Sequence, residues 1–172
     1  MTEYEVTLRF AIPQGMTREE IEACLFEVGC DDALPGTGQE GRLGVAFARE
    51  AATAEEAVAS ALQDVRQAIP EARLIEASPD LVGVSDIADL FRFSRQNMRK
   101  LIQTHHQTFP LPIHEGRLAL WHLVDVLDWF VAEGRDVDTS VRETALACMK
   151  VNLGRETERL QSLDERPLAA VF

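Results

Sequence analysis

The chain has 172 residues, 46% of them hydrophobic, and a formal net charge of −12, which is the composition of an acidic globular protein with one or two domains. No run of about 18 apolar residues occurs, and the N-terminus lacks the pattern of a signal or transit peptide, so no membrane span is expected. Cys24, Cys30 and Cys148 form no CxxC pair, so we expect buried, reduced thiols in a cytoplasmic protein.

Residues 1–79 carry the strand pattern of a small α+β domain. Polar and apolar residues alternate from Tyr4 to Ile12 and again from Leu43 to Phe47, which predicts two half-buried strands. Weaker signals near residues 32–34 and 72–77 predict two more strands.

Two helices are predicted between these strands. Thr17 and Thr53 each stand three residues before a glutamate and just before an apolar helical stripe, so both predict a capping box. Gly29 and Pro70 mark the two helix ends. The resulting order, β-α-β-β-α-β, is that of a ferredoxin-like domain. Because that fold has many functions, ligand sensing, protein pairing and a structural role all stay open.

A glycine-rich loop in this region matches a nucleotide-binding motif by its letters alone. Gly36–Gly41 has the spacing GxGxxG, but a dinucleotide site requires that loop to open a helix. The residues that follow, Arg42–Ala48, predict a strand instead. We therefore expect a hairpin turn and no nucleotide cofactor.

Two short helical patterns meet near Arg92 and predict a helix-turn-helix. Ser85 is the expected N-cap of the first helix, and Ser94 that of the second. The inward-facing residues are expected to be Ile87, Ala88, Phe91, Phe93, Met98, Leu101 and Ile102. Arg92 occupies the turn position where such motifs often have glycine, so a left-handed backbone there would cost about 1–2 kcal/mol.

The second helix, Ser94–Ile102, has an outward face suited to DNA. Arg95, Gln96 and Arg99 form one exposed stripe, with Asn97 and Lys100 beside it. Amide side chains can pair with adenine and arginine with guanine in the major groove, whereas a terminal lysine suits a phosphate. Taken alone, this face is better explained as an ordinary solvated helix surface.

A hairpin and a further helix follow. Phe109–Ile113 contains two prolines and is expected to be extended, Glu115 and Gly116 to turn, and Leu118–Trp121 to return as a strand. The stripe of the segment DVLDWF, residues 125–130, predicts a helix after it.

Residues 80–132, with these motifs in this order, resemble the winged helix-turn-helix of the MerR, AlpA and excisionase-like group. The resemblance implies that the helix from Ser94 enters a major groove, and that the wing near His114–Arg117 contacts the backbone or minor groove. Some winged helices contact proteins instead, and that alternative stays open. The residues expected to contact DNA are Ser94, Arg95, Gln96, Asn97, Arg99, Lys100, His114 and Arg117.

The acidity does not exclude DNA binding, because it is unevenly placed. Residues 1–80 hold 16 acidic and 6 basic side chains, whereas the window 92–117 holds five basic side chains and one acid, Glu115. Physiological salt screens charges that lie more than about 8 Å apart.

Residues 134–172 predict a long helix at Asp138–Leu163 and an apolar tail. Leu146, Leu153 and Leu160 contribute to a stripe that could pack on the chain itself or form a homodimer contact. The tail, Leu168–Phe172, could dock on the protein or be recognised by a protease.

The predicted fold is therefore α+β: a ferredoxin-like domain at 1–79, a winged helix-turn-helix at 80–133, and a C-terminal helix at 134–172. The first functional hypothesis is a bacterial transcriptional regulator that binds double-stranded DNA. The second is a protein-interaction partner, such as an autoregulating antitoxin or immunity protein, whose acidic first domain covers a basic partner. No catalytic motif is present, and His105, His106, His114 and His122 lack the spacing of a metal site, so neither an enzyme nor a metal is expected.

Overall fold

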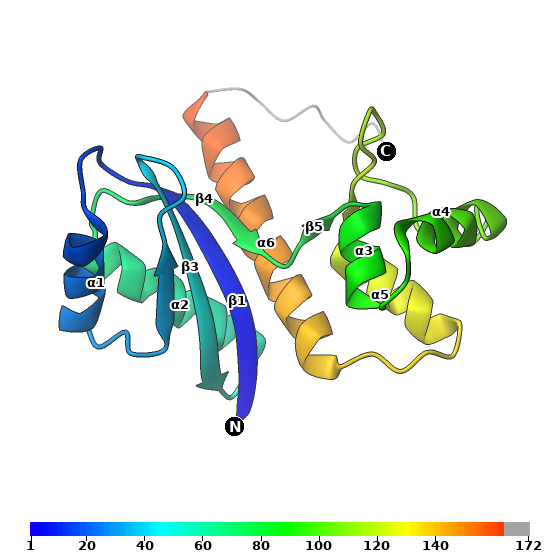
Figure 1. Cartoon of the computed structure of the whole chain (residues 1–172), viewed down its shortest axis with the longest axis horizontal. Helices are drawn as coiled ribbons and strands as arrows, with labels where there is room; N and C mark the ends of the chain where they lie inside the picture. The colour runs from blue at the N-terminus through cyan, green and yellow to red at the C-terminus, as the bar shows by residue number, and fades with distance from the viewer. Residues whose placement is uncertain (164–172) are drawn as a thin grey trace.

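The computed structural model describes residues 1–163. The larger of its two sheets is built around β1. Its strand order is β2-β3-β1-β4, and every neighbouring pair is antiparallel (Figure 1). The strands are β1 (Thr2–Ala11), β2 (Ala33–Gly36), β3 (Arg42–Ala51) and β4 (Arg73–Ser78). Gly36–Gly41 joins β2 to β3 as a hairpin, which confirms that the GxGxxG match does not open a helix.

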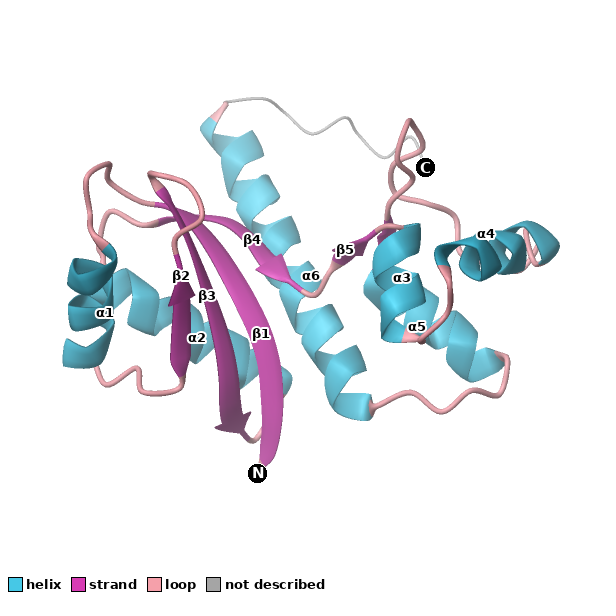
Figure 2. Cartoon of the chain, in the orientation of Figure 1, coloured by secondary structure: helices cyan, strands magenta, loops and turns pink. Residues whose placement is uncertain are grey.

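Three helices cover one face of this sheet, because the even-numbered residues of β1 point toward them. Tyr4, Val6, Leu8 and Phe10 are buried against α1 (Arg18–Glu27) and α2 (Ala54–Ala68). Figure 2 shows α6 (Thr139–Ser162) on the same side, beside α2. Within residues 1–163, no helix packs on the opposite face of the sheet at β1, where Glu3, Glu5 and Arg9 are exposed.

The predicted starts of α1 and α2 are confirmed by their cap geometry. The hydroxyl of Thr17 accepts from the backbone N–H of Glu20, and the Glu20 carboxylate accepts from the N–H of Thr17. Thr53 accepts from the N–H of Glu56 in the same way. These bonds satisfy N–H groups that a helix terminus leaves unpaired.

The remaining elements enclose a second hydrophobic core. It includes Ile87, Ala88, Met98, Trp121 and Phe130, all buried. The elements around it are β5 (Leu81–Val82), α3 (Val84–Leu90), α4 (Arg95–Thr104), β6 (Trp121–His122) and α5 (Leu123–Ala132). β5 and β6 pair antiparallel as a second, two-stranded sheet.

The prediction that Ser85 caps α3 was wrong. The helix begins at Val84, and Gly83 occupies the N-cap position. Asp86 supplies the missing side-chain acceptor, because its Oδ2 lies 2.7 Å from the backbone nitrogen of Gly83. The cap is therefore two residues before the predicted position.

Helix α6 packs against both cores. Ala147 and Cys148 belong to the core under the sheet, whereas Ala145 belongs to the second core. Its buried positions carry small residues, so the helix axis lies close to its neighbours. Of the predicted stripe, Leu146 and Met149 pack against the second core, whereas Leu153 and Leu160 are exposed.

A buried polar cluster joins α6 to both sheets. Asp80, between β4 and β5, is 1% exposed; its two carboxylate oxygens lie 2.7 Å from Nδ2 of Asn152 and 2.7 Å from Nδ1 of His122. Asn152 also bonds the backbone N–H and the carbonyl of Ala77, each at 2.8 Å. The cluster therefore connects α6, β4 and β6 at the junction between the two cores.

Within residues 1–163, no helix is both long enough and apolar enough to span a membrane. The predicted apolar tail, Leu168–Phe172, lies outside these residues.

Candidate nucleic-acid interface

The outward face of α4 is polar and cationic. Met98 is fully buried, and Leu101 and Ile102 are half-buried, which orients the opposite side of the helix to solvent. The exposed side chains on α4 include Arg95, Gln96, Asn97, Arg99 and Lys100. None of these cations forms an ion pair with any residue in the described part of the chain.

The turn that positions α4 is held by Arg92 in the left-handed region. Its φ is +56°, and it is the one non-glycine residue with positive φ within residues 1–163. The turn closes through a 2.8 Å hydrogen bond from the N–H of Phe93 to the carbonyl of Ala88. The chain thus adopts, without glycine, the backbone conformation that glycine most easily provides.

Ser94 begins α4 as predicted. Its hydroxyl accepts from the backbone N–H of Asn97 at 3.1 Å. Ser94 is therefore the N-cap, and its hydroxyl already has an intramolecular partner. The carboxamide of Asn97 is exposed and available for an external ligand.

An aromatic group anchors the turn to α5. The rings of Phe91 and Phe130 have centroids 3.8 Å apart, and Phe93 stacks on Phe91 at 6.3 Å. The guanidinium of Arg135, in the loop after α5, lies 4.8 Å from the centre of the Phe93 ring. This packing fixes the start of α4 and adds a cation that the sequence did not suggest.

The segment after α4 forms the expected hairpin, although its regular strand is short. His114 and Leu120 form a β-bridge, with a 3.0 Å hydrogen bond from the Leu120 N–H to the His114 carbonyl. The strand predicted at Leu118–Trp121 is limited to Trp121–His122 in β6. Trp121 anchors the base of the hairpin by donating its Nε1–H to the carbonyl of Pro110 at 2.9 Å.

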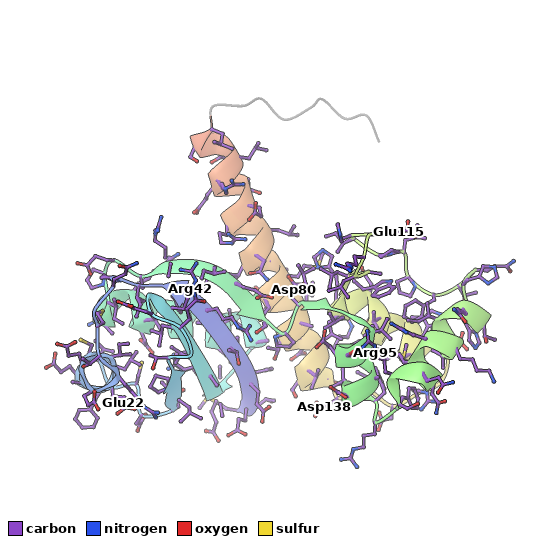
Figure 3. All side chains as sticks on the ribbon, turned by 45° about the horizontal axis from the view of Figure 1, so that its top comes forward. Glu22, Arg42, Asp80, Arg95, Glu115 and Asp138 are labelled. Carbon is purple, nitrogen blue, oxygen red and sulfur yellow. The ribbon has the colours of Figure 1, made fainter. Side chains whose placement is uncertain are left out.

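The tip of this hairpin depends on a glycine. A Cβ on Gly116 would lie 2.7 Å from Nε2 of His114, closer than real contacts allow. The imidazole of His114 therefore rests over the glycine backbone. His114 and Arg117 are both exposed at this tip, which projects from the unit near Glu115 (Figure 3).

All eight residues predicted to contact DNA are exposed, in two groups. Six belong to α4 and its cap, and two belong to the hairpin tip. The first group is Ser94, Arg95, Gln96, Asn97, Arg99 and Lys100; the second is His114 and Arg117. Gln103, also exposed on α4, was missed because the sequence prediction ended the helix at Ile102.

His105 and His122 are the less exposed of the four histidines. His122 pairs with Asp80 and has a side chain only 11% exposed. The ring of His105 packs edge-on against Trp129, with centroids 5.3 Å apart. Within residues 1–163, no group of three or more histidine, cysteine, aspartate or glutamate side chains is arranged to hold a metal ion.

The buried cysteines do not provide a reactive thiolate. Burial raises the pKa of Cys30 to about 11 and that of Cys148 to about 12, so both thiols are protonated near neutral pH.

The chemistry that the exposed α4 face and hairpin tip offer is hydrogen bonding and positive charge, in a geometry that suits an anionic polymer.

Comparisons with protein-family models, with curated proteins and with solved structures found no match to this chain.

Proposed function

We propose that the protein binds double-stranded DNA in a sequence-specific manner and regulates transcription in the bacterial cytoplasm. The observation that carries this proposal is the unpaired cationic and amide face of α4, held outward by a buried Met98 and a closed turn. An α-helix fits the major groove, where arginine and amide side chains distinguish base pairs.

We infer that residues 80–133 form a winged helix-turn-helix. Support comes from the two helices α3 and α4 joined at Arg92, and from the hairpin that follows and pairs through β6 with β5. In this arrangement α4 is the recognition helix and the tip at His114–Arg117 is the wing. We infer in the same way that residues 1–79 form a ferredoxin-like domain, because their elements run β-α-β-β-α-β.

We further propose that the protein acts as a homodimer. Leu153 and Leu160 of α6 and Leu163 at its C-cap are exposed. A dimer would present two α4 helices to half-sites about one helical turn apart, which increases specificity. Sedimentation of the full chain measures this state directly, and a monomer at micromolar concentration would contradict it.

Selection from a randomised DNA pool at two salt concentrations tests DNA binding. A sequence-specific binder enriches one motif, and its affinity for that motif falls steeply with salt as counterions are released. Failure to enrich any motif, together with salt-independent binding, would rule out the proposal.

A further inference from the structure

A wide groove lies between the uncovered face of the first sheet and the unit that contains α3. Its volume is about 1030 Å³. One wall is formed by β1, β2, β3 and β4, and the other by β5, α3 and the start of α6. Figure 1 shows these two walls side by side, with the helical layer of the sheet on the far side.

Short side chains occupy the centre of the groove floor. The strand register puts Leu34 next to Ala46, and Ala46 next to Thr7, in one row across three strands. The next row on β3 and β1 pairs Ala48 with Glu5. Because Thr7, Ala46 and Ala48 are short, a second backbone can approach the sheet closely between Leu34 and Glu5.

Large apolar side chains are exposed at the same place. Leu34 is 70% exposed, whereas Leu8 and Leu43 of the same sheet are buried. Leu81 and Leu90 line the opposite wall and are 40% and 44% exposed. Apolar side chains on both walls, within one concave surface, mark a binding groove rather than a scattered surface feature.

The walls are strongly acidic. Six carboxylates and one guanidinium line the groove. Asp32 is neutralised by Arg49, and Glu76 lies 3.6 Å from Arg9, the guanidinium that lines the groove. Glu3 and Glu5 are exposed and form no ion pair with any residue from 1 to 163. The groove therefore combines uncompensated negative charge at Glu3 and Glu5 with exposed apolar side chains on both walls.

We propose that this groove binds a cationic amphipathic segment of a partner protein. Lysine or arginine side chains would pair with Glu3 and Glu5, and apolar side chains would contact Leu34, Leu81 and Leu90. Charge complementarity selects this class of partner, since an acidic or nucleic-acid ligand would be repelled. The groove includes no residue of α4 and none of the hairpin tip, so its occupation leaves the proposed DNA surface free.

The probe is a fluorescein-labelled synthetic peptide of lysine and leucine at helical spacing. A length of about 14 residues gives a helix of about 21 Å. Fluorescence anisotropy with the full-length protein measures its affinity, and the same peptide with glutamate in place of lysine is the negative control. We expect binding of the lysine peptide that weakens as salt is raised.

Matched variants distinguish the groove from general attraction to an acidic protein. Glu3→Gln/Glu5→Gln removes two charges inside the groove, and Glu19→Gln/Glu27→Gln removes two exposed charges from α1 on the helical side of the sheet. We expect the groove variant to lose affinity by roughly 5-fold, the effect of two exposed ion pairs, and the α1 variant to lose less than about 2-fold. Leu34→Ser tests the apolar part, with an expected loss of roughly 5-fold.

Three results would overturn the proposal. One is the absence of peptide binding, and another is an equal loss in the groove and α1 variants. The third is self-association of the protein that disappears in Leu34→Ser, since the occupant would then be a second copy. Because all the substituted side chains are exposed, circular dichroism should show unchanged folding.

Discussion

The side chains of Asn152 and Asp80 form a 2.7 Å hydrogen bond that links α6 to the segment between β4 and β5. Asn152 also satisfies both backbone groups of Ala77, and Asp80 also pairs with His122. One half-buried amide therefore satisfies three polar groups at the junction between the cores. A carboxylate as buried as Asp80 is tolerated there because both oxygens have partners.

Asn152→Ala should lower the free energy of unfolding by about 2–3 kcal/mol, because it leaves partly or fully buried groups of Ala77 and Asp80 without hydrogen bonds. Urea denaturation at neutral pH measures the change. Gln161→Ala is the control: this exposed residue lies on the same helix, and its loss should change stability by less than about 0.5 kcal/mol. Equal effects of the two substitutions would contradict the role assigned to Asn152.

Arg92→Gly should raise stability slightly, by up to about 1 kcal/mol. Glycine removes a left-handed strain of about 1–2 kcal/mol but adds conformational entropy to the unfolded chain. Arg99→Gly, which also removes an exposed arginine but lies inside α4, should lower stability by about 1 kcal/mol. Thermal unfolding of the pair compares them, and a loss in both variants would argue against strain at the turn.

On a selected DNA site, base-contacting and phosphate-contacting residues should behave differently. Gln96→Ala and Asn97→Ala should each cost roughly 1–3 kcal/mol on that site and relax the preference at one base pair. Lys100→Ala should weaken binding to every sequence about equally and reduce the salt slope by about 1. Competition binding with single-base variants of the site separates the two patterns. If all three variants lost affinity in the same way, the assignment of base contacts to Gln96 and Asn97 and of a phosphate contact to Lys100 would be wrong.

Gly116→Ala should lower DNA affinity with little change in stability. The new Cβ forces the exposed imidazole of His114 to move, and an exposed ring can do so at a cost below about 0.5 kcal/mol. Gly154→Ala on α6 is the matched control, since a Cβ there meets no atom within 4 Å. Full DNA affinity in Gly116→Ala would show that the hairpin tip does not contact DNA.

Acid should weaken the ion pair between Asp32 and Arg49. The hydrogen bonds from Arg49 lower the pKa of Asp32 below its ordinary value of 3.8. A lowered pKa in the folded state stabilises the protein above the ordinary pKa, and this contribution is lost as the pH falls below it. The stability difference between the native protein and Asp32→Asn should therefore be constant from pH 7 to about pH 5 and shrink below about pH 4. Urea denaturation across this range measures the difference in stability. A difference that grows as the pH falls would contradict the prediction.

Much of the fold could be predicted from local pattern. Alternation in β1 and the caps at Thr17, Thr53 and Ser94 place these elements within one or two residues of their observed bounds, and alternation in β3 places its start, although the strand continues to Ala51. Such signals depend on neighbours in the chain, so they are visible without tertiary information. The exposure of the α4 side chains followed from the same helical periodicity.

The errors arose where long-range contacts decide. Asp80 and Asn152 are 72 residues apart, and nothing local indicates that they meet or that His122 joins them. The first part of the stripe on α6 packs on the chain, with Leu146 and Met149 half-buried against the second core. The contact with the first core is made instead by the small residues Ala147 and Cys148, which lie outside the stripe. The groove likewise exists only because two separate units are placed side by side.

The amide of Asn152 has a further effect on the edge of the first sheet. Asn152 bonds the N–H and the carbonyl of Ala77, so these two backbone groups on the outer edge of β4 are not available to pair with another strand. At the other edge, β2 is only four residues long and contains Pro35, which has no N–H to donate. Both borders are thus poor templates for intermolecular strand pairing, which protects the sheet against edge-to-edge aggregation.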